Sequence, residues 1–232
     1  MPSKRYKKAL EMVDTSKAYP LKSAVDLLTH FPKAKFNETV EVAFRLGVDP
    51  KQSDQMVRGT VPLPHGSGTI VRVLVFAKPG PAADAAQAAG AEYVGFEDLI
   101  KKCSEGWSDF DVAVATPEAM GEVRKLGKVL GPRGLMPNPK TGTVTEDTAK
   151  AVREVKAGRV EFKIDKAGNL HVPVGKVSFA SNQIVENARA VIDAVSRARP
   201  ASVKGTFIQS CTLSATMSPP VRLDVRELLS VA

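Results

Sequence analysis

The residues most suggestive of chemistry lie in one short segment, residues 127–140, which reads Gly-Lys-Val-Leu-Gly-Pro-Arg-Gly-Leu-Met-Pro-Asn-Pro-Lys. Prolines hold such a chain extended, and glycines let a partner approach the backbone closely. The cations Lys128, Arg133 and Lys140 suit contact with phosphate groups. A rigid surface loop with solvated charges has the same composition. The segment by itself leaves both interpretations open and slightly favours the structural one.

Signatures of catalysis and metal binding are missing from the sequence. The three histidines lie far apart, and no pair of His or Cys residues has the spacing of metal ligands. A phosphate-binding P-loop needs four residues between its glycines, followed by Lys and Ser or Thr. Here five residues separate Gly121 from Gly127, and Val129 stands where the hydroxyl is required. We therefore expect no catalytic residue, metal or cofactor, and the sequence predicts that the protein is not an enzyme.

The net charge of +8 is distributed unevenly along the 232 residues. Residues 1–66 carry +4, residues 67–157 carry no net charge, and residues 158–232 carry +4. A basic excess at both ends of the chain favours a polyanionic partner, because counterions are released when phosphates are neutralised. The alternative is that the charge only aids solubility.

The cysteine content and the hydropathy of the sequence indicate the cellular compartment in which the protein works. Cys103 and Cys211 are too few for a disulfide framework and read as buried small hydrophobes. No apolar run is long enough to span a membrane, and none follows the basic residues of Met1–Lys8 as a signal peptide requires. We expect a cytoplasmic protein without membrane contact.

Hydrophobic periodicity predicts a mixture of helices and strands for the two ends of the chain. The expected elements are helices over residues 21–31 and 181–199 and strands over residues 40–48, 160–164, 170–174 and 206–213. Strict alternation in the first strand indicates one buried face. The turn Asp165-Lys166-Ala167-Gly168 between two alternating stretches is typical of a β-hairpin.

The middle of the chain has a different pattern. Residues 70–77 form a nearly continuous apolar run, typical of a strand covered on both faces, and helix and strand patterns then alternate. Such alternation predicts a parallel sheet flanked by helices. The simplest architecture is an α+β domain of residues 1–66 and 158–232, with an α/β domain of residues 67–157 inserted on glycine-bearing hinge linkers. One continuous α/β domain is the alternative.

The unusual segment also carries a resemblance. Its core, Leu-Gly-Pro-Arg-Gly-Leu-Met-Pro-Asn at residues 130–138, resembles the signature of the ribosomal protein L1 family in its bacterial form. Further similar stretches follow in the expected order between Lys4 and Val221, at residues 34–42, 53–55, 57–60, 63–66, 156–162, 175–176 and 216–217. The resemblance implies an α+β domain built from both chain ends, with an inserted three-layer α/β domain (parallel sheet, Rossmann-like) on a hinge.

The resemblance implies a function as well. The family binds large-subunit rRNA at the base of the mobile stalk beside the tRNA exit site, and movement of the stalk accompanies release of deacylated tRNA. Bacterial members are similar to translational repressors that bind their own operon mRNA. The expected partners are therefore rRNA, exit-site tRNA, this mRNA and other ribosomal components, with the protein a monomer in the ribosome. A nucleotide-binding enzyme using the middle domain is the main alternative, and an RNA-binding regulator outside the ribosome is another.

The resemblance also assigns RNA-binding residues. The family's RNA face maps onto Lys35, Phe36, Glu38, Thr39, Asp165, Lys166, Gly168, Ser210, Thr216, Met217 and Ser218, and the loop cations Lys128, Arg133 and Lys140 are candidates for a second RNA contact. Hydroxyls reach phosphate or ribose, lysines neutralise phosphates, and apolar side chains contact bases. One physical argument supports part of this set independently. If strands 40–48 and 206–213 pair antiparallel, residues 36–39 neighbour residues 214–217.

The chain departs from the family pattern at Ser218, where the family usually has glycine in Thr-Met-Gly-Pro. Glycine permits close backbone approach or a positive φ. We therefore expect Ser218→Gly to keep or tighten the affinity for stalk rRNA. A tenfold loss of affinity, about 1.4 kcal/mol, would show that this position has been misread.

Overall fold

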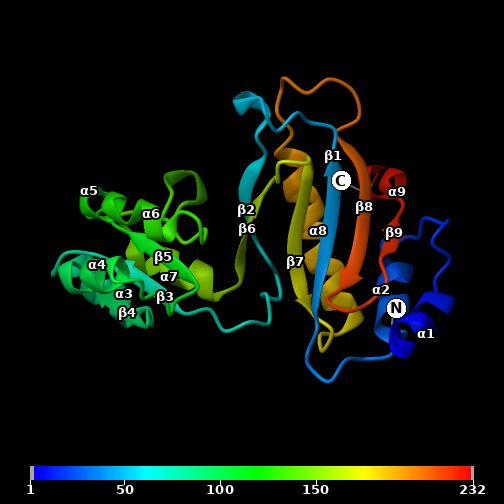
Figure 1. Ribbon diagram of the computed structural model, residues 1–232, viewed down its shortest axis with the longest axis horizontal. Coiled ribbons are helices and arrows are strands. Elements are labelled where there is room, and N and C mark those ends of the chain that lie inside the picture. The colour runs from blue at the N-terminus through cyan, green and yellow to red at the C-terminus, as the bar shows by residue number, and fades with distance from the viewer. Residues whose placement is uncertain (1–2, 231–232) are drawn as a thin grey trace. The chain divides into compact units, whose positions relative to one another are not determined.

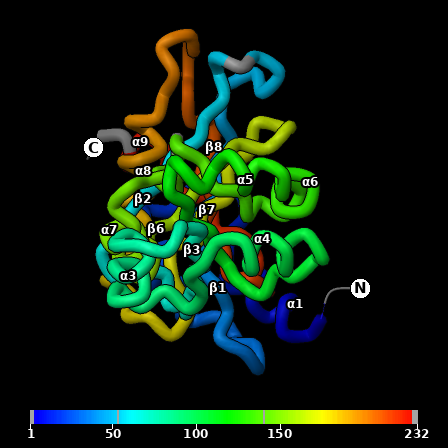
Figure 2. Tube along the Cα trace, turned by 90° about the vertical axis from the view of Figure 1, so that its left-hand side faces the viewer, coloured from blue at the N-terminus to red at the C-terminus, as the bar shows by residue number. Residues whose placement is uncertain are grey.

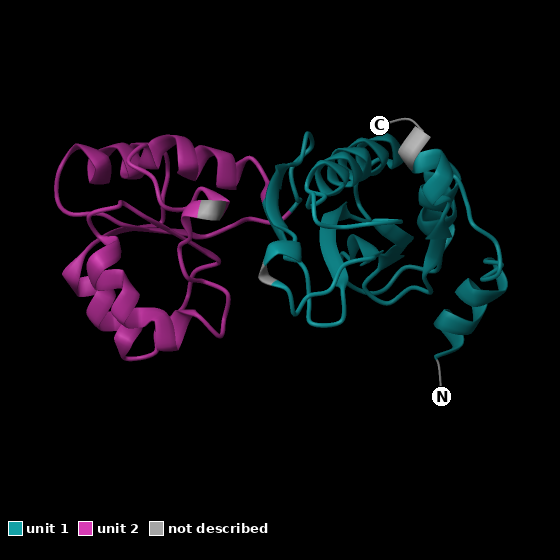
Figure 3. Cartoon of the chain, turned by 90° about the horizontal axis from the view of Figure 1, so that it is seen from above, with its two compact units in different colours: residues 1–68, 160–232 teal, residues 69–159 magenta. Residues whose placement is uncertain are grey.

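The computed structural model describes residues 3–230, without the side chains of Ser53, Lys140, Leu229 and Ser230. The chain forms two compact units (Figure 3). Unit 1 consists of residues 1–68 and 160–232, and unit 2 of residues 69–159. Each unit has its own hydrophobic core. No helix among residues 3–230 is long and apolar enough to cross a membrane.

Unit 1 is built on a four-stranded antiparallel sheet in the order β7-β1-β8-β9 (Figure 1). The strands are β1 (Thr39–Leu46), β7 (Asn169–Lys176), β8 (Ile208–Ala215) and β9 (Val221–Leu223). Along β1, Val40, Val42, Phe44 and Leu46 are buried, and the residues between them are half-buried or exposed. This is the alternation that a strand shows when helices cover one of its faces. The expected strand with one buried face is confirmed.

Two helices cover the buried face of this sheet. They are α2 (Leu21–His30) and α8 (Ser181–Arg197), which pack on each other and share one core with the sheet. Both were expected from their apolar stripes. Figure 1 shows α8 behind the strands. Unit 1 also contains α1 (Lys4–Glu11), η1 (Ser53–Gln55) and α9 (Val225–Ser230).

The expected β-hairpin is wrong in its pairing. The turn at residues 165–168 forms, and Asp165 N donates to Asn169 O at 2.8 Å. However, β6 (Arg159–Lys163) pairs with β2 (Arg58–Pro62) in a separate two-stranded sheet, whereas β7 pairs with β1. Ile164 N donates to Val57 O at 3.0 Å, which directs the chain towards β2 before the turn begins. Alternation identifies a strand, but it does not identify the strand's partner.

Unit 2 contains a three-stranded parallel sheet in the order β4-β3-β5, which confirms the parallel sheet expected from the sequence. The strands are β3 (Val73–Phe76), β4 (Tyr93–Gly95) and β5 (Val112–Ala115). Leu74 and Phe76 pack towards a group formed by α4 (Glu97–Ser104), α5 (Met120–Val123), η2 (Arg124–Leu126) and α6 (Gly127–Leu130). Val73 and Val75 pack towards α3 (Pro81–Ala88) and α7 (Thr148–Lys156). The unit therefore has three layers, and it also contains η3 (Pro139–Thr141), in which Thr141 is buried.

Both cysteines are buried, as expected. Burial raises the pKa of the Cys211 thiol to about 12. Cys211 lies on the covered face of β8 and Cys103 lies in the core of unit 2. Their thiols are therefore inert packing groups.

Candidate nucleic-acid interface

The face of the unit 1 sheet opposite α2 and α8 is lined by small and polar side chains. Because side chains alternate along a strand, the residues between the buried ones of β1, β7 and β8 share this face. The register places them in three cross-strand rows: Glu41 with Pro173 and Ser214, Ala43 with His171 and Thr212, and Arg45 with Asn169 and Ser210. We call these nine residues the open face. It offers hydroxyl, imidazole, amide and guanidinium groups to a partner, together with the carboxylate of Glu41.

The RNA-binding residues expected from the sequence gather at two opposite ends of this sheet. Residues 33–39, 176 and 215–218 form the Phe36 end, where β1 starts and β8 finishes. Residues 45–48, 165–169 and 208–210 form the Lys166 end, where Leu46 N donates to Gly168 O at 2.9 Å. The eight residues of β1 separate the two ends by roughly 23 Å. The expected site is therefore two clusters joined by the open face.

Strand pairing holds the Phe36 end together. Thr39 N donates to Thr216 Oγ1 at 3.0 Å, and Thr216 N donates to Thr39 O at 3.1 Å. The predicted neighbourhood of residues 36–39 and 214–217 is thus confirmed. Lys176 Nζ donates to Thr39 Oγ1 at 2.7 Å from the end of β7. The sequence analysis did not include Lys176 among the expected site residues, because its place opposite Thr39 depends on the pairing of β7 with β1, which no local pattern records.

Two apolar side chains project from the same end. Phe36 is 51% exposed and Met217 is 52% exposed, and the two lie together at this end of the sheet. Asn37 Nδ2 donates to Ser178 Oγ at 3.0 Å beside Phe36, and Lys35 is exposed next to it. Exposed aromatic and thioether groups next to a cation suit the stacking of unpaired bases.

Glu38 does not project outward. Its side chain is buried, and both carboxylate oxygens are occupied within unit 1. Oε1 accepts hydrogen bonds from Arg5 Nη1 and Ala34 N, each at 2.9 Å, and Oε2 accepts one from Met217 N at 2.9 Å. The carboxylate therefore ties α1, the loop before β1 and the turn after β8 to one another. An anion in this position shapes the site without opposing a phosphate.

Ser218 adopts an ordinary backbone conformation. No non-glycine residue among residues 3–230 has a positive φ. The Ser218 hydroxyl accepts a hydrogen bond from Ala215 N at 2.8 Å, and Ser218 N donates to Ala215 O at 3.0 Å. Serine thus closes the turn with its side chain where the family usually has glycine, and the turn itself does not require glycine.

At the Lys166 end, Asp165 and Gly168 shape the turn, and Lys166 is its exposed cation. Asp165 Oδ1 accepts hydrogen bonds from Asn169 N at 2.7 Å and Ala167 N at 2.8 Å. These N–H groups, that of Asn169 above all, lower the pKa of the Asp165 carboxyl. Gly168 has φ 84° and lies against the carbonyl oxygen of Leu46, so a side chain there would be strained.

The segment 127–140 of unit 2 is partly buried. Leu130 and Pro137 are buried, and a Cβ on Gly131 would lie 2.4 Å from the carbonyl oxygen of Gly127. Lys128 and Arg133 are exposed, although the Arg133 guanidinium donates to Ser108 Oγ. The side chain of Lys140 lies outside the described residues. Much of the motif therefore folds unit 2, which leaves Lys128 as its freest cation among the described side chains.

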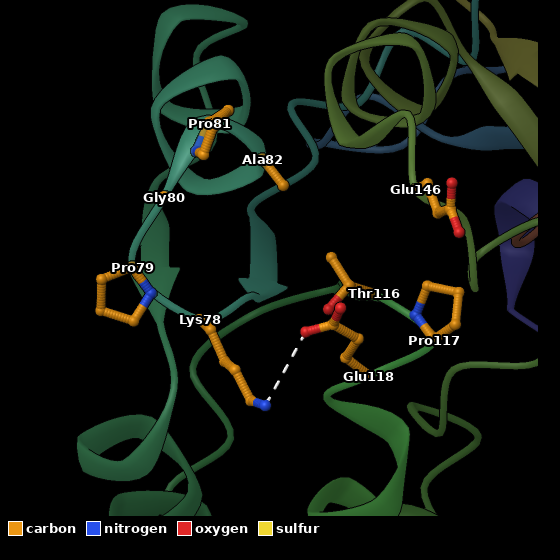
Figure 4. Close-up of a pocket in the computed structure, with 9 residues that line it drawn as sticks. All are labelled: Lys78, Pro79, Gly80, Pro81, Ala82, Thr116, Pro117, Glu118 and Glu146. Atoms are coloured by element: carbon orange, nitrogen blue, oxygen red, sulfur yellow. Dashed lines mark ion pairs between the residues drawn. The ribbon is translucent and has the colours of Figure 1, made fainter.

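The nucleotide-binding alternative can be examined at the carboxyl ends of β3 and β5, where open α/β sheets bind ligands. A pocket there is lined by Lys78, Pro79, Gly80, Pro81, Ala82, Thr116, Pro117, Glu118 and Glu146 (Figure 4). Its one lysine pairs with Glu118 at 3.7 Å, and Glu146 adds a second carboxylate. Prolines on both sides of Gly80 remove N–H donors that a phosphate would need. The pocket does not suit a nucleotide, and no group of three or more metal-ligating side chains occurs among the described residues.

Comparison with known proteins agrees with this geometry. A family model described as "Ribosomal protein L1p/L10e family" matches residues 27–219. The chain belongs to this family. Membership implies a structural role in the ribosome and binding of rRNA, and the family is not an enzymatic one. The matched residues contain both ends of the sheet and the open face, but they leave out α1.

The hydrogen bonds of the Glu38 carboxylate with Arg5, Ala34 and Met217 lead to a prediction about stability. Replacing Arg5 with Ala leaves the buried carboxylate with only its two N–H donors. We expect the free energy of unfolding to fall by about 2 kcal/mol, as for other charge-assisted hydrogen bonds. Chemical denaturation measures this change. The matched control is Arg226→Ala, since Arg226 is exposed on α9 and its side chain forms no hydrogen bond or ion pair within the described residues. Equal effects of the two substitutions would refute the role of Arg5.

Proposed function

We propose that the protein binds large-subunit rRNA at the base of the mobile stalk, through the open face of the unit 1 sheet and its two ends. Family membership supports rRNA binding, and one structural observation carries the location. Residues from both halves of unit 1 converge on a polar sheet face whose two ends carry exposed lysines, with exposed apolar groups at the Phe36 end. A span of roughly 23 Å corresponds to several nucleotides of RNA, so one RNA can contact both ends.

The proposed contacts follow from the chemistry of each side chain. Lys35 and Lys166 neutralise phosphates at opposite ends, while the hydroxyls of Thr39, Thr216 and Ser210 bond to phosphate or ribose. Phe36 and Met217 pack against unstacked bases. Glu38, Asp165, Gly168 and Ser218 hold the backbone in which these groups are set. Backbone groups near them remain available to the RNA.

We further propose that the two units are hinged domains that move with the stalk. Residues 1–66 and 158–232 form the RNA-binding domain, and residues 67–157 form a domain inserted into it. Gly66, Gly68 and Gly158, all with positive φ, lie in the two linkers. Interdomain motion is the ordinary behaviour of domains joined in this way. Lys128, Arg133 and Lys140 of the inserted domain then supply a second contact, with rRNA or with the elbow of the tRNA.

We also propose that the protein has a role in tRNA release and a role in translational repression. The protein takes part in release of deacylated tRNA from the exit site, because it moves with the stalk beside that site. It also represses translation of its own operon mRNA, where an RNA structure similar to the rRNA site occupies the same sheet face. The protein is cytoplasmic in both roles; it is a ribosome-associated monomer in the first and is bound to the mRNA in the second. Stalk rRNA and this mRNA should therefore compete for the same surface of the protein.

The direct test is binding of the purified protein to the stalk segment of large-subunit rRNA across a salt series, beside a shuffled RNA of equal length. We expect affinity to fall as salt rises while the preference for the stalk sequence persists. Phe36→Ala should weaken binding by about 1–3 kcal/mol, the usual contribution of a base stacked on an aromatic ring. Ile70→Ala is the matched control, because Ile70 is 90% exposed but lies in unit 2.

Lys166→Gln tests the other end of the sheet with the same RNA. Loss of one phosphate contact should lower the slope of log affinity against log salt by about 0.7–0.9. Equal binding of stalk and shuffled RNA by the unaltered protein would contradict the proposal. An effect of Phe36→Ala without any effect of Lys166→Gln would confine the interface to the Phe36 end.

A further inference from the structure

Helix α1 is a short basic element that neither the family match nor the proposed interface includes. It contains four cations, Lys4, Arg5, Lys7 and Lys8, against one carboxylate, Glu11 at its last position. The three lysines are exposed, and no ion pair joins them to any residue in the described part of the chain. Spacings of three and four residues place them on one side of the helix. The result is a concentrated positive charge that is not neutralised within unit 1.

The position of α1 depends on a few specific contacts. An eight-residue helix is marginal by itself, and Ala9 is the only residue of α1 that is buried. Leu10 and Met12 remain 40% and 44% exposed, whereas Ala9 and, just after the helix, Val13 join the core of unit 1. Ser3 Oγ caps the helix by accepting from Tyr6 N at 3.2 Å. The hydrogen bonds of Arg5 add to this small apolar attachment.

Arg5 attaches α1 to the Phe36 end of the sheet. Its Nη1 donates to Glu38 Oε1 at 2.9 Å, and its Nη2 donates to the carbonyl oxygen of Met217 at 3.2 Å. Both Figure 1 and Figure 2 show α1 at the end of the sheet where the loop before β1 lies. One guanidinium thus fixes the basic helix beside the two segments that carry Phe36 and Met217.

We propose that α1 is a phosphate-binding arm of the RNA interface, in which Lys4, Lys7 and Lys8 contact the sugar–phosphate backbone next to the bases held by Phe36 and Met217. The proposal rests on the RNA-binding function proposed above and extends the interface beyond the residues matched by the family model. Lys33 and Lys35 on the neighbouring loop are also exposed and without ion pairs among the described residues. Because Arg5 neutralises Glu38, that carboxylate does not weaken this field, and Glu11 is the one carboxylate on α1 itself.

The chemistry of the arm determines what it contributes. An ammonium group is a flexible point charge that meets phosphate without reading a base. The arm therefore adds affinity and salt dependence, and it leaves the preference between RNA sequences unchanged. A merely solvated basic helix, the competing interpretation, would alter neither quantity specifically.

The experiment compares full-length variants in the salt series with stalk rRNA and shuffled RNA. The variant Lys4→Gln, Lys7→Gln, Lys8→Gln removes three exposed charges with side chains that favour helices about equally. The control Lys101→Gln, Lys102→Gln, Lys150→Gln removes the same charge from exposed helical sites in unit 2. A second variant, Lys4→Arg, Lys7→Arg, Lys8→Arg, retains the charge and should behave as the unaltered protein.

The expected result is that the α1 variant lowers the slope of log affinity against log salt by about 2, as loss of three phosphate contacts requires. Its ratio of stalk to shuffled affinity should stay the same, and the control should keep the original slope. If the α1 variant and the control change the slope equally, or neither does, the arm is refuted while the proposed function stands. If the unaltered protein shows no preference for the stalk RNA, the proposed function fails first and the arm fails with it.

Discussion

The alternation of side chains along β1 is the constraint on which unit 1 depends. Val40, Val42, Phe44 and Leu46 face α2 and α8, so the residues between them must face away from the core. A slip of one residue would exchange the two faces and expose the apolar set, which is why the register is strongly specified. β1 also lies between β7 and β8, and each end of it therefore gathers a segment from a distant part of the sequence.

The ends of the sheet are shaped by internal hydrogen bonds, and the exposed groups depend on that shaping. Glu38 holds three segments together at one end, and Asp165 performs a similar task for the turn at the other. The carboxylates of Glu38 and Asp165 accept hydrogen bonds from groups within unit 1. At the two ends of the sheet, lysines, hydroxyls and apolar side chains therefore remain for a partner. In the proposed RNA interface Glu38 and Asp165 thus act as framework, whereas Glu41 presents its carboxylate on the open face.

The sequence predicted the strands and helices of this unit better than it predicted their partners. Periodicity identified β1, α2 and α8, since burial of one face leaves a regular pattern. It misassigned β6 to a hairpin with β7, because pairing with β2 depends on a contact between residues about a hundred positions apart, which no local pattern records. The neighbourhood of Thr39 and Thr216 was predictable from antiparallel geometry. The inward orientation of Glu38 and the place of Lys176 were not, because they depend on side-chain conformations at the sheet ends.

Hydroxyl-radical footprinting of the protein, free and bound to stalk rRNA, shows whether the RNA covers the open face of the unit 1 sheet and its two ends. Phe36 and Met217 are exposed and have oxidisable side chains at one end of the sheet, and His171 lies on the open face between the two ends. We expect RNA to slow the oxidation of all three, while Ile70 in unit 2 keeps its rate. Protection of unit 2 alone, with Phe36, Met217 and His171 oxidised as fast as in the free protein, would contradict it.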